Sequence, residues 1–339
     1  MNQGTCSVVE DLNSALAGLL AEDESLFLLG EDIASPYGGA FKATRELSDL
    51  FPDRVISTPI SEQAMMGVAN GLALSGNRVI VELMFSDFAL LTFDQLVNVS
   101  SKSVDMYGRR LPMHVVVRCP SGGYRGYGPT HSQSLQKYFI GIPHLQVFEA
   151  SAFHSARDVL AHMLDLGLPC VYFEEKVLYP QPLAADGSDH GFFQRRTVGE
   201  APGTVEFTSG APEDADCVLI CPGGMAGQVL GAAEQLLLRD EVATAVYVPS
   251  RLHPFDLDAV AQTVSSVGRV CVVDQGSAGG TWAEAVAHRL HTELWGSLKQ
   301  PVRVVNSLAS AIPAAVHLER EVLVQQQWII EAVREVLGG

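Results

Sequence analysis

The residue best placed to do chemistry is a carboxylic acid at the start of an expected helix. Residues 57–76 read STPISEQAMMGVANGLALSG, with Ser61 placed to cap the helix and Glu62 in its first turn. The free backbone N–H groups there favour a negative charge, whereas deep burial would raise the pKa of Glu62 and suit it to proton transfer. An ordinary acid at a helix start is the simpler interpretation of this stretch alone.

The helix that carries Glu62 also has an unusual surface. Apolar residues occur around nearly all of it, which predicts a helix buried on most sides. Gly67, Gly71 and Ser75 recur every four residues, so one stripe has almost no side chains. We expect another helix to pack closely on that stripe, offsetting the weak helix propensity of glycine.

Three loops after expected strands carry the other candidate residues. Two of them are short, at residues 30–32 and 85–88, and the third, residues 120–133, reads PSGGYRGYGPTHSQ. Its glycines would let the backbone pass close to a ligand with the His131 imidazole aimed at it, although a merely hydrogen-bonded histidine is the alternative. The glycine-rich residues 276–280, which open another helix, could cradle an anion.

The elements that must position these residues alternate between strand and helix. We expect strands at residues 26–29, 54–57, 78–82, 113–118, 145–148 and 170–174, and helices at 7–22, 42–50, 88–106 and 153–166, besides the helix after Ser61. The strands are short and rich in β-branched residues, as in a parallel sheet with helices on both faces. Ligands of such sheets collect where the strands end, and the candidate loops lie there.

A second α/β unit follows a connector. Residues 176–214 contain several prolines and glycines with little periodicity, which predicts a connector that could hold a short hairpin. Beyond it we expect strands at 216–221, 244–248, 269–274 and 302–305, and helices at 225–239, 256–264, 281–294 and 318–337. The resulting domains are 1–178 and 213–339, with a linker at 179–212.

The composition limits the possible partners. The 339 residues carry a formal charge of −17 and are 47% hydrophobic, which indicates a compact globular protein and argues against a nucleic-acid or anionic-membrane partner. The six cysteines show no CxxC or metal-ligand spacing, so we expect buried thiols in a reducing cytoplasm. No signal peptide or apolar run of membrane-spanning length is expected. The common nucleotide, zinc and hydrolase motifs are missing from the sequence.

Eight motifs in order support a resemblance that spans nearly the whole chain. They are GED at 30–32, RVISTPISEQ at 54–63, GxxxG at 67–71, ELMFSDF at 82–88, FDQLVN at 93–98, RCPSG at 118–122, HSQS at 131–134 and FEEKVLY at 173–179. Together they resemble the beta subunit of thiamine-diphosphate-dependent 2-oxo acid dehydrogenases. The fold implied is α/β, a transketolase-like pyrimidine-binding domain followed by a smaller transketolase C-terminal-like domain.

The resemblance assigns roles to individual residues. It implies that Glu62 hydrogen-bonds a ring nitrogen of the cofactor's aminopyrimidine and that Phe88 packs on the face of that ring. His131 corresponds to an active-site histidine that assists acyl transfer to a lipoyl arm. The positions that line the cofactor and substrate pocket are Ile60, Met84 and Leu91.

The resemblance also implies a partner, because the GDG…N motif that holds the diphosphate through Mg²⁺ is missing here. An alpha subunit would supply the diphosphate and Mg²⁺ site in an α2β2 assembly, and this chain alone would be inactive. Gly67 and Gly71 correspond to a helix stripe packed across a subunit interface. A lipoyl acyltransferase component and a small 2-oxo acid are the other partners implied.

Three departures from the family pattern leave the substrate open. His144 follows Pro143 where the family has histidine before the proline, and residues 163–168 offer only Asp165, which argues against a K⁺ site. Residues 124–127 are bulkier and more basic than expected, which could serve an unusual acid or carrier, or be drift in a dispensable rim.

The expected function is therefore decarboxylation of a 2-oxo acid with acyl transfer to a lipoyl carrier. One alternative keeps thiamine chemistry in an acyloin-forming carboligase or an acyl-transfer enzyme of a specialised pathway. Another, of a different class, is a non-catalytic scaffold or regulatory homologue.

Overall fold

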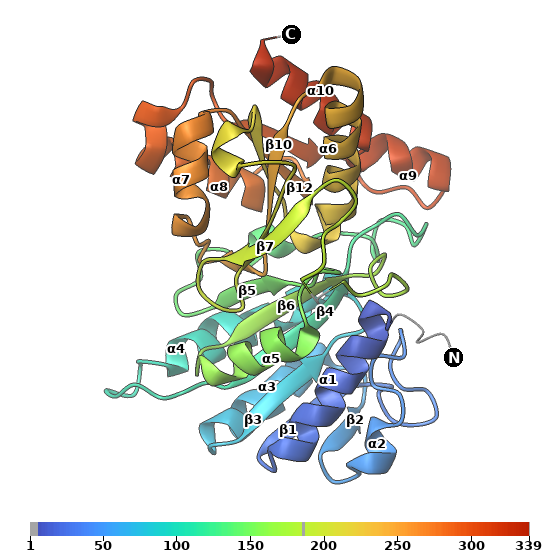
Figure 1. Ribbon diagram of the computed structural model, residues 1–339. Helices are drawn as coiled ribbons and strands as arrows, with labels where there is room; N and C mark the ends of the chain where they lie inside the picture. The colour runs from blue at the N-terminus through green and yellow to red at the C-terminus, as the bar shows by residue number, and fades with distance from the viewer. Residues whose placement is uncertain (1–5, 185–186, 339) are drawn as a thin grey trace. The chain divides into compact units, whose positions relative to one another are not determined.

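The computed structural model describes residues 6–184 and 187–338, which belong to two compact α/β units (Figure 1). The first unit comprises Met1–Ser121 and Phe139–Leu183, and the second comprises Gly122–Tyr138 and Ala184–Gly339. The segment with His131 thus belongs to the second unit, although the residues on both sides of it belong to the first. The domain limits expected from the sequence remain a proposal.

The first unit is built on parallel strands whose carboxyl ends meet at one edge. The strands are β1 (Leu26–Glu31), β2 (Val55–Thr58), β3 (Arg78–Glu82), β4 (Val115–Ser121), β5 (Gln146–Glu149) and β6 (Cys170–Glu175). They are neighbours in the order β5-β6-β4-β3-β1-β2, and every pair is parallel. Four of them are buried along nearly their whole length, as a sheet covered on both faces requires.

Helices cover both faces of this sheet (Figure 1). The α-helices of the unit are α1 (Val8–Glu22), α2 (Leu47–Leu50), α3 (Glu62–Leu74), α4 (Ser101–Ser103) and α5 (Ala156–Asp165). Helices α1 and α5 pack together on one face, and α3 lies on the other against β3 and β1. Reciprocal hydrogen bonds between Ser7 and Glu10 form a capping box that fixes the start of α1.

The helix expected at residues 42–50 is wrong except for its last turn. Lys42 and Glu46 both have left-handed backbone angles, with φ of 65°. The Asn13 side chain donates to the carbonyl oxygens of Ala43 and Arg45, so these carbonyls are committed to a neighbouring helix. Tertiary hydrogen bonds therefore override the local helical pattern.

The helix expected at 88–106 is present as a continuous helical segment that ends at Ser103, but it is not a single regular α-helix, because the segment changes its winding. It runs through a 3₁₀ segment η1 (Ser86–Thr92) and a π-helical segment η2 (Gln95–Ser100) before α4. The side chains of Asn70 and Ser100 donate to the carbonyl oxygen of Gln95, at 3.2 and 3.1 Å. Side chains that take a helix carbonyl in this way interrupt the regular α-helical ladder.

The second unit is built on a mixed sheet in the order β13-β12-β9-β10-β8-β7. The strands of this sheet are β7 (Gln194–Val198), β8 (Thr204–Thr208), β9 (Cys217–Ile220), β10 (Thr244–Pro249), β12 (Val270–Ser277) and β13 (Arg303–Ser307), and the unit also contains the short strand β11 (Arg251–His253) outside the sheet. Strands β7 and β8 form the hairpin expected in the connector, and β8 pairs antiparallel with β10. The connector therefore adds two strands to this sheet.

In its described residues, the second unit contains five α-helices. They are α6 (Ala226–Asp240), α7 (Asp258–Val267), α8 (Trp282–Leu294), α9 (Val316–Val322) and α10 (Gln326–Leu337). Two pairs of them, α6 with α10 and α7 with α8, pack beside the sheet of this unit. The single helix expected at 318–337 is thus wrong: it divides into α9 and α10 around the buried Leu323 and Val324. The hydroxyl of Tyr124 donates to the carbonyl oxygen of Val324 at 2.6 Å, which removes that carbonyl from a continuous helix.

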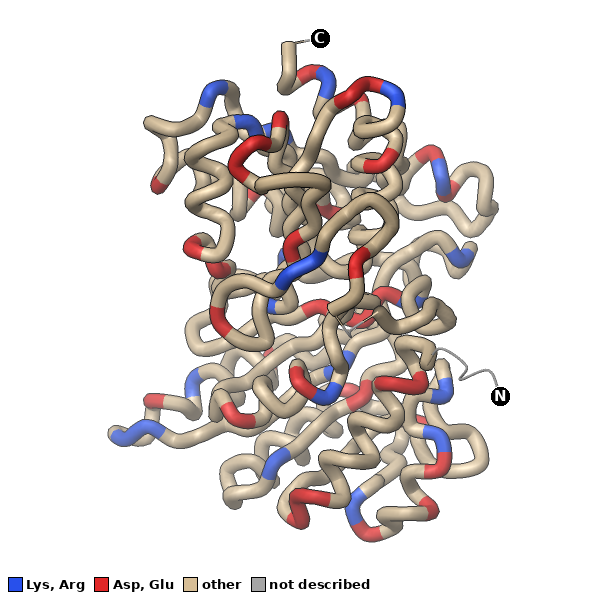
Figure 2. Tube along the Cα trace, viewed as in Figure 1, with Lys and Arg blue, Asp and Glu red and all other residues tan. Residues whose placement is uncertain are grey.

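Acidic residues outnumber basic ones over both units. Asp and Glu number 39 against 22 Lys and Arg, and Figure 2 shows the basic residues singly or in neighbouring pairs along the trace. Five cysteines are buried as expected, and Cys6 is exposed. Among the described residues, no helix is both long enough and apolar enough to cross a bilayer.

Candidate functional site

Two carboxylates meet where β1 ends and α3 begins. Ser61 precedes the first helical residue, Glu62, as expected, but its side chain makes no capping hydrogen bond. Its backbone N–H instead donates to Oε1 of Glu31, the last residue of β1, at 3.1 Å. Glu62 is only 7% exposed and Glu31 only 2%. The parallel pairing of Glu31 with Thr58 brings the ends of β1 and β2 together and thereby sets the two acids side by side.

In the part of the chain that the structure describes, neither Glu31 nor Glu62 forms an ion pair with a cationic side chain. Burial raises the pKa of Glu31, the charge of Glu62 raises it further, and the hydrogen bond from Ser61 opposes the shift. Within the described residues, Oε2 of Glu31 is buried and has no hydrogen-bond partner. Sequence reasoning singled out the loop at 30–32 but gave Glu31 no role. Its position at the end of a strand next to the one leading to Glu62 was the available signal.

Apolar side chains of the first unit surround the start of α3. The 3₁₀ segment η1 packs against α3 and carries Phe88, which is half-buried with its ring edge-on to Phe85 at 6.0 Å between centroids. Met84 is half-buried, whereas Ile60 is 74% exposed and Leu91 is 56% exposed. These side chains can line a flat, partly apolar ligand at the carboxyl end of the sheet.

The expected burial of α3 on most sides is wrong for this chain by itself. Val68 is 56% exposed and Leu74 is 42% exposed, and both lie on the helix face that also carries Gly71. A methyl group added at Gly71 would meet no atom within 4 Å, and one at Gly67 would meet only the Gln95 side chain, at 3.7 Å. The small-residue stripe is therefore uncovered and open to a partner.

His131 lies in the second unit, in the irregular segment 122–138. Its Nδ1 is 2.9 Å from the Thr130 hydroxyl oxygen, and its ring is half-buried. The segment is fixed by the Gly126 N–H, which donates to the buried Glu319 carboxylate at 3.1 Å. Gly126 has a φ of +70°, and a side chain there would press on the carbonyl oxygen of Ala314, so glycine is required. The other candidates, Glu62, Phe88, Ile60, Met84 and Leu91, lie in the first unit.

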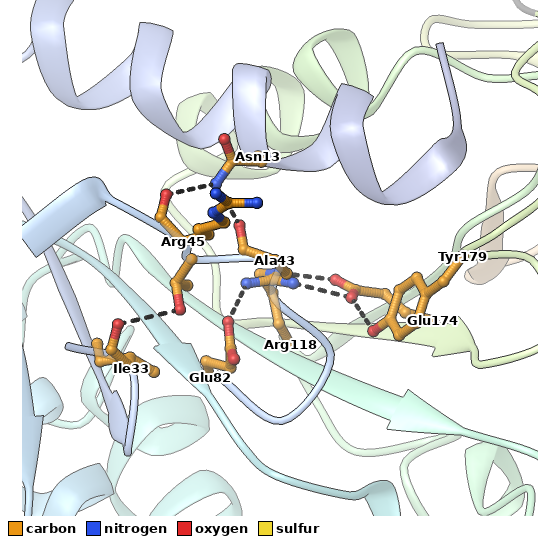
Figure 3. Close-up of polar contacts among 9 residues, drawn as sticks. Asn13, Ile33, Ala43, Arg45, Glu82, Arg118, Glu174 and Tyr179 are labelled. Atoms are coloured by element: carbon orange, nitrogen blue, oxygen red, sulfur yellow. Dashed lines mark hydrogen bonds and ion pairs between the residues drawn. The ribbon is translucent and has the colours of Figure 1, made fainter. Parts of the chain in front are cut away.

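A fully buried ionic network supports the first sheet just behind its carboxyl edge (Figure 3). Arg118 of β4 donates through Nη1 to Glu82 of β3 at 2.6 Å. Its Nε and Nη2 form a bidentate pair with Glu174 of β6, at 2.7 and 2.9 Å, and the Tyr179 hydroxyl donates to the same carboxylate at 2.7 Å. A side chain at Gly39 would collide with Glu82, so the loop that follows β1 is fitted to this network.

The expected anion site at residues 276–280 and the expected cation ligand Asp165 are both occupied by other side chains of this protein. The Glu284 carboxylate accepts hydrogen bonds from the backbone N–H groups of Gly279, Gly280 and Thr281, so the expected anion cradle is already filled by the chain's own acid. Asp165 forms an ion pair with Arg78 at 2.9 Å. Across residues 6–184 and 187–338, no cluster of three or more His, Cys, Asp or Glu side chains is arranged to hold a metal ion.

Two family descriptions match the chain in the expected order. Residues 5–182 match the pyrimidine-binding domain of transketolase, and residues 211–329 match the transketolase C-terminal domain.

Relatives in other organisms align with this chain over most of their length. The mitochondrial pyruvate dehydrogenase E1 component subunit beta of Saccharomyces cerevisiae is 31% identical, over 98% of this chain and 89% of the relative. The pyruvate dehydrogenase E1 component subunit beta of Rickettsia felis is 27% identical, over 97% of this chain and 98% of the relative. A solved split-gene transketolase, described as an inactive beta4 tetramer, has a TM-score of 0.70 over 99% of both chains at 20% identity, which supports the fold.

Proposed function

The chain belongs to the family of pyruvate dehydrogenase E1 beta subunits, and on that premise we propose that it is the beta subunit of a thiamine-diphosphate-dependent 2-oxo acid dehydrogenase. The observation that carries the proposal is the buried Glu31–Glu62 pair, which lies within the range matched by the pyrimidine-binding domain. The comparisons do not favour the carboligase or scaffold alternatives.

The residues around Glu62 fit the aminopyrimidine end of thiamine diphosphate. That ring needs a carboxyl group at its edge and apolar or aromatic groups on its faces, which Glu62, Phe88 and the half-buried Met84 can offer. The unpartnered oxygen of Glu31 marks a polar environment beside them. When bound, the cofactor supplies the carbanion-stabilising chemistry of decarboxylation.

In this proposal Glu62 holds a proton at a ring nitrogen of the cofactor. Glu31 assists because burial and the charge of Glu62 raise the pKa of Glu31, which favours retention of a proton beside the cofactor. Ile60 and Leu91, whose side chains are largely exposed in this chain, line the cofactor and substrate pocket with Met84. His131 gives or takes a proton during acyl transfer to the lipoyl group.

The open face of α3 supports a partner subunit. A helix can approach the Gly67–Gly71 stripe closely, and covering Val68 and Leu74 would remove their apolar surface from water. We assign the diphosphate and Mg²⁺ site to an alpha-like partner in an α2β2 assembly, because the GDG…N motif is missing from this sequence. A lipoyl acyltransferase as acyl acceptor and a cytoplasmic location complete the proposal.

Reconstitution with the alpha-like partner tests the function. The assembled enzyme, supplied with thiamine diphosphate, Mg²⁺ and a series of 2-oxo acids, should reductively acylate a lipoyl protein, whereas this chain alone should not. Aldehyde acceptors assayed in parallel detect carboligation. Carboligation without lipoyl acylation would overturn the acyl-transfer assignment, and a stable assembly that binds no thiamine diphosphate would overturn the enzymatic one.

A further inference from the structure

A cavity of about 140 Å³, partly open to solvent, lies at the carboxyl ends of β12 and β13 in the second unit. We call it the β12–β13 pocket; its polar lining includes Lys137, Gln275, Ser277 and Ser307. The strands are parallel, with Ser277 opposite Ser307, so the cavity occupies the place where ligands of parallel sheets usually collect. A cavity of about 150 Å³ holds a molecule of benzene size, which has six heavy atoms.

Two buried polar groups in this pocket have no protein partner within the described part of the chain. Gln275 is 5% exposed, and its Oε1 accepts from the Gly123 N–H at 3.2 Å and from the Ser134 hydroxyl at 2.8 Å. Because a backbone N–H can only donate, this contact fixes the amide orientation and leaves the NH₂ group of Gln275 unsatisfied. The hydroxyl of Ser307, which is 2% exposed, is unsatisfied as well.

The pocket also contains the ammonium group of Lys137, which forms no ion pair among the residues that the structure describes. Lys137 Nζ donates to the carbonyl oxygens of Ser277 and Gly279, at 2.9 and 3.1 Å, and to the Ser277 hydroxyl at 3.2 Å. All three acceptors are uncharged. The nearby Asp274 carboxylate accepts from the backbone N–H groups of Gly276 and Ala283, at 2.7 and 3.2 Å. Burial raises the pKa of Asp274, and the charge of Lys137 opposes that shift without a direct ion pair.

Apolar side chains make up another part of the lining, and they select among small anions. They include Leu135, Leu308, Ile312 and Val322. A phosphate would need donors on every side, whereas a carboxylate has one charged end and one end that tolerates apolar contact. The donors and the ammonium match the charged end, and the aliphatic side chains match a chain of one or two carbons.

We propose that the β12–β13 pocket binds a small monocarboxylate, from acetate to a 2-oxo acid of three carbons. The carboxylate accepts hydrogen bonds from the Gln275 amide and the Ser307 hydroxyl, and the positive charge of Lys137 attracts it. This inference concerns binding only and does not depend on the proposed dehydrogenase activity.

The test measures binding of ¹³C-labelled acetate and pyruvate to the full-length chain, without thiamine diphosphate, by NMR titration. Saturable binding at one site per chain is expected. Ser307→Ala should weaken it about threefold through loss of one neutral hydrogen bond, and Lys137→Met about tenfold through loss of the charge. A crystal soaked with acetate should show the carboxylate beside Gln275.

Thr244→Val is the matched control, because the Thr244 hydroxyl is also buried without a partner but lies outside this pocket. It should leave the affinity unchanged. Ser307→Ala removes a hydroxyl that makes no hydrogen bond within the protein, so its fold should survive. Lack of saturation at tens of millimolar, density for water alone, equal affinity for inorganic phosphate, or binding that is unchanged in Ser307→Ala and Lys137→Met would each overturn the proposal.

Discussion

Two groups of buried carboxylates in the first unit differ in how their charge is treated. Glu82 and Glu174 share the guanidinium of Arg118, which meets both through short hydrogen bonds (Figure 3). Glu31, at the end of β1, accepts from the Ser61 N–H, and neither Glu31 nor Glu62, the first residue of α3, forms an ion pair within the described residues. The first group is complete within this chain, and the second leaves a polar atom unsatisfied.

The difference separates a structural use of buried acids from a functional one. Burial raises the pKa of Glu82 and Arg118 opposes that shift, while the two carboxylates together raise the pKa of Arg118. At Glu31 the neighbouring charge is another carboxylate, so burial and repulsion act in the same direction. Unneutralised acids of this kind cost stability, and proteins keep them mainly where a ligand or a reaction uses them.

The largest effect on stability is expected when the Arg118–Glu82–Glu174 network loses its guanidinium group. Arg118→Met leaves two buried carboxylates unpaired and should lower the free energy of unfolding by about 3–5 kcal/mol, measured by urea denaturation. Arg303→Met is the control, because Arg303 and Glu335 form an exposed pair with about half of each side chain in water, and it should change stability by less than about 1 kcal/mol. Equal effects of the two substitutions would show that the network is not structural.

Substitution in the Glu31–Glu62 pair should change the activity of the assembled enzyme more than the stability of the chain. Glu62→Gln keeps the size of the side chain but cannot exchange the proton that we assign to it, so turnover of the assembled enzyme should fall at least about 100-fold. The unfolding midpoint should stay the same or rise. The control, Glu331→Gln, changes an exposed acid on α10. Near-normal turnover in Glu62→Gln would contradict the proposed mechanism.

The sequence predicted the second group better than the first. Ser61 and Glu62 could be placed because a helix start has local signals in consecutive residues. The Arg118 network depends on the register of three parallel strands, with Glu82 opposite Arg118 and Arg118 opposite Tyr172, two residues before Glu174. No local pattern specifies such a register, and Glu31 was left without a role for the same reason.

Local patterns also predicted most strands but misjudged helices that depend on distant contacts. Asn13 and Tyr124 each take a backbone carbonyl from a segment more than 25 residues away in sequence, and the expected helix is shortened or divided there. The predicted burial of α3 is wrong because apolar residues of an uncovered interface have the same sequence pattern as residues of the core. The positions of Phe88 and His131 relative to a bound cofactor remain predictions.

The glycine stripe on α3 is a second feature of the first unit that this chain alone leaves without a partner. Gly71→Ala should raise the stability of the isolated chain by up to about 1 kcal/mol, because alanine is the better helix former and its methyl group meets no atom here. The same methyl group should hinder a closely packed partner helix, so association with the alpha-like subunit, measured by analytical ultracentrifugation, should weaken. Gly227→Ala on α6 also adds a methyl group into open space and should leave association unchanged. Unimpaired assembly of the Gly71 variant would remove the stripe from the interface.

The smallest effect is expected when one charge of the Glu31–Glu62 pair is removed. Because the pKa of Glu31 is raised in the folded state, the folded chain holds the Glu31 proton more tightly than the unfolded chain does. Glu31 therefore lowers stability as the pH rises from its unfolded-state pKa through its folded-state pKa. Glu31→Gln should therefore stabilise the chain at pH 8 by on the order of 1 kcal/mol, the scale of like-charge repulsion at a partly screened site, and the gain should vanish near pH 4. Glu10→Gln should show the opposite trend, because hydrogen bonds from Ser7 lower the pKa of Glu10. Urea denaturation across this pH range measures both, and a Glu31→Gln gain that does not change with pH would mean that the two acids of this group do not share a charge penalty.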